Sequence, residues 1–161
     1  MSVWYIYKFL PFHLQSLLLT AYNADQYRKR HQGSYRSQLE FYAKAWASPL
    51  SVWKNDSETR LSQFLNYAVR NSSWYSNFEG AELSEFPVLE KRDLIRDLDA
   101  IRTVDKKNAV VSLTGGTTGA SMKVLYTLND IQERFAILDS FRAKHGYLLG
   151  DKVAWFSGKN L

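Results

Sequence analysis

A glycine-rich segment between two short apolar runs constrains the fold of this chain most strongly. Residues 114–119 read Thr-Gly-Gly-Thr-Thr-Gly and hold three of the chain's eight glycines. The flanking runs, residues 109–113 and 122–127, are rich in β-branched and aromatic residues, which predicts two strands. Glycine lets the backbone approach a ligand closely, loop N–H groups can form an anion site, and threonine hydroxyls add donors. The segment therefore indicates a phosphate-binding loop for a nucleoside triphosphate.

A plain hairpin connection is the alternative, since glycine also suits tight turns. The lack of Asn and Asp between residues 109 and 128 argues slightly against it, because turns favour those residues. The spacing excludes two common phosphate motifs. A P-loop needs Gly-Lys-Ser/Thr leading into a helix, and the dinucleotide fingerprint needs Gly-x-Gly-x-x-Gly. Here Lys123 follows Met122 and a strand comes next, so loop N–H groups, hydroxyls and Lys123 are the phosphate donors available.

The residues before the strands predict a mainly helical region. Residues 1–54 read as helix that breaks near Pro11 and Gly33, with a bend at residues 48–49. Residues 56–57 predict the N-cap of a further helix, which ends at residues 71–73. Its apolar stripe, spaced for one helical face, predicts a side that packs in the core. The stripe consists of Leu61, Phe64, Leu65, Ala68 and Val69.

The next segments predict a short helix at residues 91–98 and a long helix after the second strand. Asn129 predicts the N-cap of the long helix, with Gln132 completing a capping box, and Gly146 suits the position after its end. The predicted inward face consists of Ile131, Phe135, Leu138 and Phe141. Residues 153–156 read as a third strand buried on both faces, which needs neighbours on both edges. We therefore expect the chain to be the front part of something larger.

Charge and composition narrow the function classes. The chain has 161 residues, the size of one domain, and no cysteine, which excludes disulfides and thiolate chemistry and fits a cytoplasmic location. The net charge of +5 arises in residues 1–54, which hold seven Lys/Arg and two Asp/Glu. The basic patch at residues 28–31 is too short to predict a nucleic-acid partner. A solvated basic face and attraction to an anionic partner such as membrane lipid both remain open.

The first twenty-two residues are strongly apolar, but they predict neither a transmembrane helix nor a signal peptide. Polar residues and Pro11 interrupt the apolar run, and no positive segment precedes it. A helix packed on the protein core is the preferred interpretation. A partner subunit and peripheral contact with a membrane surface are the alternatives.

The stretch TGGTTGASMK resembles the phosphate-binding signature of the adenylate-forming (AMP-binding) enzyme superfamily. It is most similar to the phenylacetate–CoA ligase-like branch, which includes relatives encoded with capsular polysaccharide genes. That branch typically reads Thr-Gly-Gly-Thr-Thr-Gly-x-Pro-Leu-Lys. Ser121 replaces the proline and Met122 the leucine, and losing the proline leaves the loop exit less rigid. The matching residues are Thr114, Gly115, Gly116, Thr117, Thr118, Gly119 and Lys123.

Weaker matches to the same branch occur in family order along most of the chain. Upstream, LPFHLQ at residues 10–15 and RKRHQGSYR at residues 28–36 resemble the polysaccharide-linked members. A Pro-Val-Leu-x-Lys-x-x-Leu segment is matched at residues 87–94, with Glu90 in place of a capping threonine. The remaining matches are Tyr67-Ala68 with Trp74-Tyr75, and Arg142, Gly146, Gly150 and Asp151.

The resemblance implies an α/β fold in which a helical region, residues 1–105, packs on the start of the adenylation-domain sheet. Residues 106–161 would be the truncated start of the ATP-binding domain. Relatives form an acyl-adenylate from a carboxylic acid and ATP, then transfer the acyl group, usually to coenzyme A. ATP, Mg²⁺ and coenzyme A are the implied cofactors, and a nucleotide is the implied partner.

The family places its adenine-binding and acidic metal-binding residues further downstream, so no catalytic residue is identified in this chain. His13, His31 and His145 do not have metal-ligand spacing, and no metal site is predicted. We expect an N-terminal ligase fragment that is inactive alone. The alternative is a noncatalytic interaction protein that binds a partner chain or a membrane surface. Unpaired strands would favour a complementing chain or a second copy through edge pairing.

Overall fold

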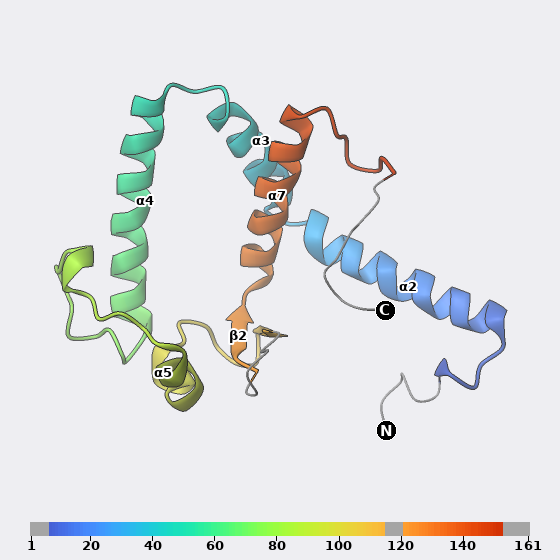
Figure 1. Ribbon diagram of the computed structural model, residues 1–161, viewed down its shortest axis with the longest axis horizontal. Helices are drawn as coiled ribbons and strands as arrows, with labels where there is room; N and C mark the ends of the chain where they lie inside the picture. The colour runs from blue at the N-terminus through green and yellow to red at the C-terminus, as the bar shows by residue number, and fades with distance from the viewer. Residues whose placement is uncertain (1–6, 115–120, 153–161) are drawn as a thin grey trace. The chain divides into compact units, whose positions relative to one another are not determined.

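The computed structural model describes residues 7–114 and 121–152, and the chain divides into two compact units. Unit 1 combines the residues up to Ala47 with those from Gln132 onward, and unit 2 runs from Ser48 to Ile131. The fold is mixed α/β with helices dominating, and the predicted third strand at residues 153–156 lies outside the described residues (Figure 1). The elements are α2 (Phe12–His31), α3 (Tyr35–Ala45), α4 (Leu50–Asn71), η1 (Leu83–Glu85), α5 (Lys91–Arg96), α6 (Leu98–Ile101), β1 (Val110–Leu113), β2 (Lys123–Tyr126) and α7 (Leu128–Lys144).

Proline and glycine set the helix boundaries in the first third of the chain, as predicted. Pro11 and Pro49 directly precede α2 and α4, where the fixed φ of proline suits a helix start and its missing N–H costs nothing. Gly33 separates α2 from α3 and has a φ of 60°, a conformation that favours glycine. The predicted breaks near Pro11 and Gly33 and the bend at residues 48–49 are therefore confirmed.

The predicted N-cap at residues 56–57 is wrong, because α4 already begins at Leu50 and passes through both residues. The Ser57 hydroxyl donates to the Lys54 carbonyl at 2.8 Å, which is a bond back into the same helix. Asp56 forms an ion pair with Arg60 one turn later, at 2.9 Å. Side chains that bond within their own helix do not end it, so the stronger signal of Pro49 sets the start.

The apolar stripe of α4 lies on one helical face as predicted, but only part of it is buried. Ala68 is buried, whereas Leu61 is 38% and Phe64 is 63% exposed. Beside the stripe, residues 78–86 leave an open hollow of about 770 Å³ that is lined by Leu61, Leu65, Val69, Phe78 and Phe86, among others. The prediction that the stripe is core is therefore wrong for Leu61 and Phe64.

The start of α7 differs from the prediction by two residues. The Thr127 N–H donates to Asp130 Oδ2 at 2.7 Å, and the Asp130 N–H donates to Thr127 Oγ1 at 3.1 Å. These reciprocal bonds form a capping box, so the box predicted at Asn129 and Gln132 is wrong. A threonine and an aspartate three residues apart satisfy two helix-end donors, which leaves the Gln132 side chain for another contact.

The buried face of α7 is polar, which contradicts the predicted apolar face. Its buried residues are Gln132, Ala136, Asp139 and Ser140. Of the predicted inward residues, Leu138 and Phe141 are exposed, while Ile131 and Phe135 are half-buried. The helical phase was predicted from apolarity, but hydrogen-bonding partners on other elements set it.

Those partners lie at the end of α2 and along α3, about a hundred residues earlier in the chain. The Ser34 N–H and hydroxyl donate to Gln132 Oε1 at 3.0 and 3.1 Å, and Gln132 Nε2 donates to the Lys29 carbonyl at 3.2 Å. The Tyr35 hydroxyl donates to Asp139 Oδ2 at 3.0 Å. Trp46 Nε1 donates to Ser140 Oγ at 3.0 Å. We call these hydrogen bonds together the polar seam of unit 1.

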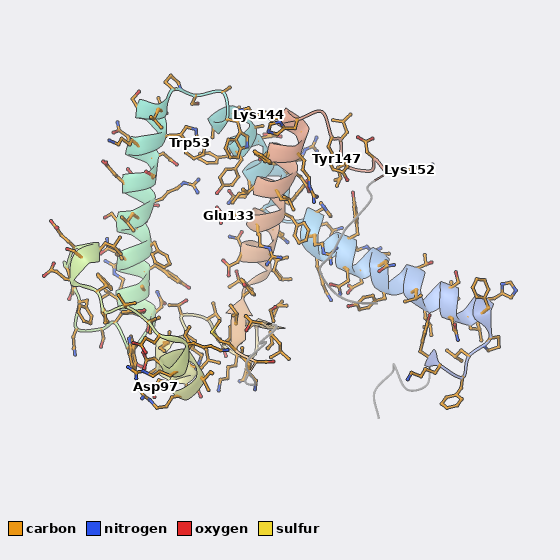
Figure 2. All side chains as sticks on the ribbon, viewed as in Figure 1. Trp53, Asp97, Glu133, Lys144, Tyr147 and Lys152 are labelled. Carbon is orange, nitrogen blue, oxygen red and sulfur yellow. The ribbon has the colours of Figure 1, made fainter. Side chains whose placement is uncertain are left out.

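Neighbouring contacts extend the polar seam along α7. The Tyr42 hydroxyl donates to Glu133 Oε1 at 2.6 Å, and the Lys144 ammonium lies 5.7 Å from the Trp46 ring centre. Figure 2 labels Glu133 and Lys144 on α7. At the other end, Gly146 has a φ of 86° and its N–H donates to the Ala143 carbonyl at 3.0 Å. The predicted glycine position after the helix is therefore confirmed.

Replacing Gly33 tests how tightly the polar seam packs. A Cβ at Gly33 would lie 2.7 Å from Gln132 Oε1, whereas a Cβ at Gly80, with a φ of 75°, meets nothing within 4 Å. Gly80→Ala should cost about 1 kcal/mol of unfolding free energy from backbone strain alone. Gly33→Ala should cost about 1–2 kcal/mol more, because the Gln132 bonds are displaced. Urea denaturation followed by circular dichroism measures both, and equal costs would contradict this packing.

Alkaline pH tests the Tyr35–Asp139 bond. Burial, the hydrogen bond to Asp139 and the Asp139 charge raise the pKa of Tyr35 well above the ordinary tyrosine value of 10.0. The folded state thus holds the phenol proton more tightly, so this stabilisation is complete below pH 10 and is lost as pH rises above it. Tyr35→Phe should lower stability by about 1–2 kcal/mol at neutral pH. That difference from the wild type should shrink by about 1.4 kcal/mol per pH unit above pH 10, and a constant difference would contradict the assignment.

Candidate functional site

The two predicted strands are confirmed, and they form an antiparallel pair that carries the glycine-rich loop. The register pairs Val110 with Tyr126 and Leu113 with Lys123, so the chain reverses direction between them. Residues 115–121 make this connection, longer than the two to five residues of usual hairpin loops. The predicted phosphate ligands Gly115, Gly116, Thr117, Thr118 and Gly119 lie outside the described residues. Thr114 and Lys123, at the base of the loop, lie within them.

Thr114 closes the base of the loop by bonding twice to Met122. Its N–H donates to the Met122 carbonyl at 2.9 Å, and its Oγ1 accepts the Met122 N–H at 3.2 Å. A hydroxyl that accepts one bond keeps its own hydrogen for another acceptor. Thr114 can therefore hold the two ends of the loop together and donate its hydroxyl hydrogen to an anion there.

Lys123 begins β2 directly across from Leu113 and is exposed. Among the described residues no carboxylate forms an ion pair with its ammonium group, and residues 109–128 contain no Asp or Glu. A base with hydroxyl and ammonium donors and no acidic residue suits an anionic ligand. Phosphate binding by Thr114 and Lys123 stays a prediction, as it does for the five loop residues outside the described part of the chain.

The face of β2 next to this base borders a hollow that it shares with the short helices α5 and α6. This hollow of about 300 Å³ is lined mainly by apolar side chains, with Leu94, Leu98 and Ile101 opposite residues 122–125. This lining positions the hairpin and supplies few groups for a charged ligand. Arg102 also borders the hollow, and its Nε and Nη1 donate to protein oxygens.

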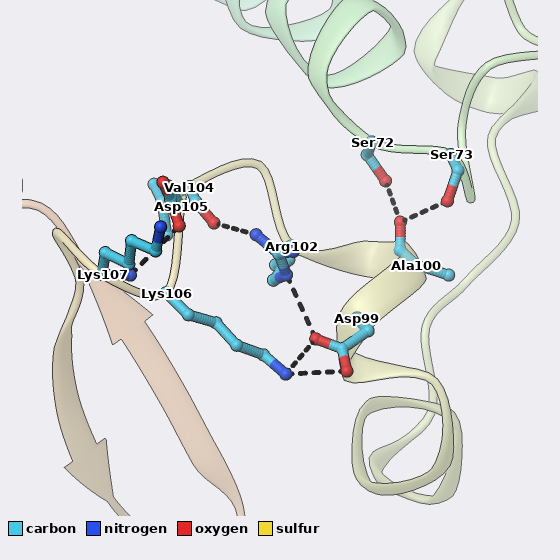
Figure 3. A network of polar contacts seen from close by, with 9 residues as sticks. All are labelled: Ser72, Ser73, Asp99, Ala100, Arg102, Val104, Asp105, Lys106 and Lys107. Carbon is cyan, nitrogen blue, oxygen red and sulfur yellow. Dashed lines mark hydrogen bonds and ion pairs between the residues drawn. The ribbon is translucent and has the colours of Figure 1, made fainter.

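Arg102 belongs to an ionic network in the segment that precedes β1 (Figure 3). Arg102 Nε donates to Asp99 Oδ1 at 3.1 Å, Arg102 Nη1 donates to the Val104 carbonyl at 2.6 Å, and Lys106 Nζ donates to Asp99 Oδ2 at 2.8 Å. The Lys106 and Arg102 hydrogen bonds lower the pKa of Asp99. The Ser72 hydroxyl donates to the Ala100 carbonyl at 2.8 Å, which ties the end of α4 to α6. These cations therefore position the strand rather than bind phosphate.

Sequence reasoning missed this network and the Thr127–Asp130 cap. The signal for the first was the three-residue spacing of Asp99 and Arg102, which places both side chains on one helical face. The signal for the second was a threonine three residues before an aspartate at the end of a strand. Both devices lie in the segments that flank the hairpin, so they fix where its strands begin and end.

Several residues that match the resembled family outside the loop have structural contacts here. Arg142 Nη1 lies 3.5 Å from Asp139 Oδ1, and its guanidinium carbon lies 5.5 Å from the Tyr147 ring centre. The Leu148 N–H donates to Asp151 Oδ2 at 2.7 Å, next to Gly150 with a φ of 108°. These contacts shape the turn after α7.

In the family match at residues 87–94, Glu90 replaces a capping threonine, and Asp93 takes over the capping of the helix. The Glu90 N–H donates to Asp93 Oδ2 at 3.2 Å, and the Asp93 N–H donates to the Glu90 carbonyl at 3.0 Å. The start of α5 is therefore capped from within the helix by Asp93.

The described residues contain no group of three or more His, Asp or Glu side chains that could hold a metal ion. His31 lies between the Tyr27 carbonyl and Asp139, and His145 contacts the Phe141 ring, so the structure does not bring the histidines together. The donors at the loop base fit the phosphates of ATP. The described residues supply no carboxylate set for Mg²⁺, which would then be held mainly by the phosphates themselves.

The chain is similar to Protein CapK of Staphylococcus aureus. The two are 27% identical over 168 residues, which cover 98% of this chain and 36% of that relative. The chain thus spans about a third of the length of the relative. No protein-family model and no solved structure matches it. Within the described residues, no helix has the length and apolarity needed to cross a membrane.

Substitution of Thr114 tests the closure of the loop. Thr114→Val removes the acceptor of the Met122 N–H while keeping the side-chain shape, so we expect that amide to exchange with deuterium about fivefold faster, the effect of roughly 1 kcal/mol. Thr114→Ser keeps the hydroxyl and should exchange like the wild type. Amide hydrogen exchange resolved by NMR measures both, and equal acceleration in the two variants would contradict the bond.

Proposed function

We propose that this chain is the N-terminal part of an ATP-dependent, AMP-forming carboxylic acid ligase, with a role linked to capsular polysaccharide biosynthesis. Such a ligase joins a carboxylic acid to AMP with release of pyrophosphate, and then forms an acyl-CoA. The observation that carries the proposal is the hairpin in which Thr114 and Met122 close a glycine- and threonine-rich loop beside Lys123.

Each donor at this hairpin has a separate part in the proposal. The N–H groups of Gly115, Gly116 and Gly119 and the hydroxyls of Thr117 and Thr118 would hold the β- and γ-phosphates. Preorganised donors of this kind stabilise the charge that develops on a leaving pyrophosphate. Thr114 would hold the loop ends and donate its hydroxyl hydrogen, and Lys123 would add a positive charge.

The comparison with Protein CapK supports the same proposal over nearly the whole chain. Because the match spans 36% of that relative, we propose that the groups for adenine, metal and the acyl acceptor lie in the part that has no counterpart here. The chain alone would then bind phosphate without completing the reaction.

One observation favours a second candidate, a noncatalytic interaction protein. All four residues of β1 are exposed, and Val111 and Leu113 are 56% and 62% exposed. Within the described residues the outer edge of β1 has no pairing strand. An uncharged, apolar edge is a template for another strand, supplied by a complementing chain or a second copy.

Nucleotide binding at the loop tests the proposal. Addition of Mg·ATP to the 161-residue chain should shift the amide resonances of residues 114–123 more than those around Gly33 or Gly80. Thr117→Val combined with Thr118→Val, and separately Lys123→Gln, should each weaken binding about fivefold or more, since each removes donors to charged oxygens. Lys107→Gln is the control, because Lys107 lies before β1. No shift in the loop, or equal loss in the control, would contradict the proposal.

Pyrophosphate release tests whether the 161-residue chain can carry out adenylation by itself. With ATP, Mg²⁺ and a panel of carboxylic acids, the 161-residue chain should release no more pyrophosphate than a blank. Steady release that depends on the acid would show that this chain catalyses adenylation by itself. A stable, monodisperse chain that ignores ATP in both experiments would favour the interaction protein.

A further inference from the structure

The helix α2 differs from the other long helices because none of its 20 residues is buried. Phe12 is 75% and Leu17 is 64% exposed, and Leu14, Leu18, Leu19 and Tyr22 are exposed as well. The preferred sequence interpretation, a helix packed on the protein core, is therefore not borne out by the described residues. So much exposed apolar surface on one element indicates an interaction site.

Four apolar residues of α2 share one face. Leu14, Leu17, Leu18 and Ala21 follow the spacing i, i+3, i+4 and i+7, which places them on one side of the helix. We call this set the leucine face. The opposite side carries Ser16, Thr20 and Asn23, which are exposed and uncharged, together with the exposed Phe12 and Leu19. Residues 9–24 contain no Asp, Glu, Lys or Arg, so nothing charged interrupts the face.

Positive charge lies where the leucine face ends. Arg28 follows Ala21 by seven residues and so continues the same side of the helix, and Lys29 lies beside it. The Lys29 ammonium pairs with Asp25, the acidic residue on this side, at 2.5 Å. Arg28 to His31 form the last turn of α2, and the whole chain's net charge of +5 arises in residues 1–54.

Among the described residues, the contacts of α2 with α3 and α7 involve its C-terminal end, and the leucines of the leucine face are exposed. Gln132 Nε2 donates to the Lys29 carbonyl, the Arg30 guanidinium lies 4.9 Å from the Phe135 ring centre, and His31 lies 3.5 Å from Asp139. At the other end, Gln15 Nε2 donates to the Tyr7 and Leu10 carbonyls, which holds the preceding turn against the helix start. Figure 1 shows α2 extending away from α3 and α7.

We propose that α2 docks unit 1 onto an anionic membrane surface, with the leucine face in the lipid boundary and Arg28 and Lys29 on the headgroups. An uncharged apolar face suits partial burial below the headgroups. Basic residues at its end suit the negative potential of anionic lipids. This combination favours anionic lipid over a second copy, because headgroups offer the basic end a negative partner and a second copy of the leucine face does not. The proposal does not depend on the ligase assignment.

Vesicle co-sedimentation tests the leucine face. The full chain should bind vesicles containing a quarter phosphatidylglycerol and bind pure phosphatidylcholine much more weakly. Leu14→Gln, Leu17→Gln and Leu18→Gln together should weaken binding at least tenfold, because the apolar area is lost. Ser16→Gln, Thr20→Gln and Asn23→Gln on the opposite side form the matched control and should bind like the wild type. Circular dichroism checks that all variants keep their helical content.

The charge variants test the choice of lipid. Arg28→Gln with Lys29→Gln should weaken binding to the anionic vesicles about twentyfold, and about 0.5 M salt should have a similar effect. Lys91→Gln with Lys107→Gln removes the same charge from unit 2 and should leave binding unchanged.

Three results would overturn the proposal. They are an absence of binding to the anionic vesicles, equal binding to both vesicle types, and equal losses in the test and control variants. A wild-type dimer in light scattering that the leucine variants convert to a monomer, without vesicle binding, would assign the face to a second copy instead.

Discussion

The hydrogen bonds between α7 and the α2–α3 region hold unit 1 together, and the unit depends on them. Gln132 and Asp139 are buried on α7 and bind Ser34, Lys29 and Tyr35, which lie about a hundred residues earlier. A buried polar group without a partner costs about 1–3 kcal/mol, so these pairs select one rotation of α7.

The sequence predicted what depends on local chemistry. Pro11, Gly33 and Pro49 act on their own backbone, so their breaks are found where they were expected. The strands flanking the loop also follow from local β propensity. The face of α7 and the burial of Phe64 depend on distant partners. No local pattern shows that Asp139 meets Tyr35, or that the stripe of α4 stays partly uncovered. The predicted boundary after residue 105 stays a prediction.

The candidate site shows the same contrast between features that depend on local chemistry and features that depend on distant partners. Thr114 and Lys123 were predicted from a motif, and the structure places them at a closed loop base without a neighbouring carboxylate among the described residues. The Asp99–Arg102–Lys106 network was not predicted, because its role depends on how α6 approaches β1. Similarity to Protein CapK extends over nearly the whole chain, so it covers the helices as well as the hairpin.

The central claim is that the loop between β1 and β2 binds the terminal phosphates of ATP. The phosphorus-31 NMR spectrum of Mg·ATP, recorded with increasing amounts of the chain, tests it most directly because it observes each phosphate separately. Our account predicts that the β and γ resonances broaden or shift more than the α resonance, and that Thr117→Val with Thr118→Val removes the effect. Unchanged β and γ resonances with the wild-type chain would contradict it.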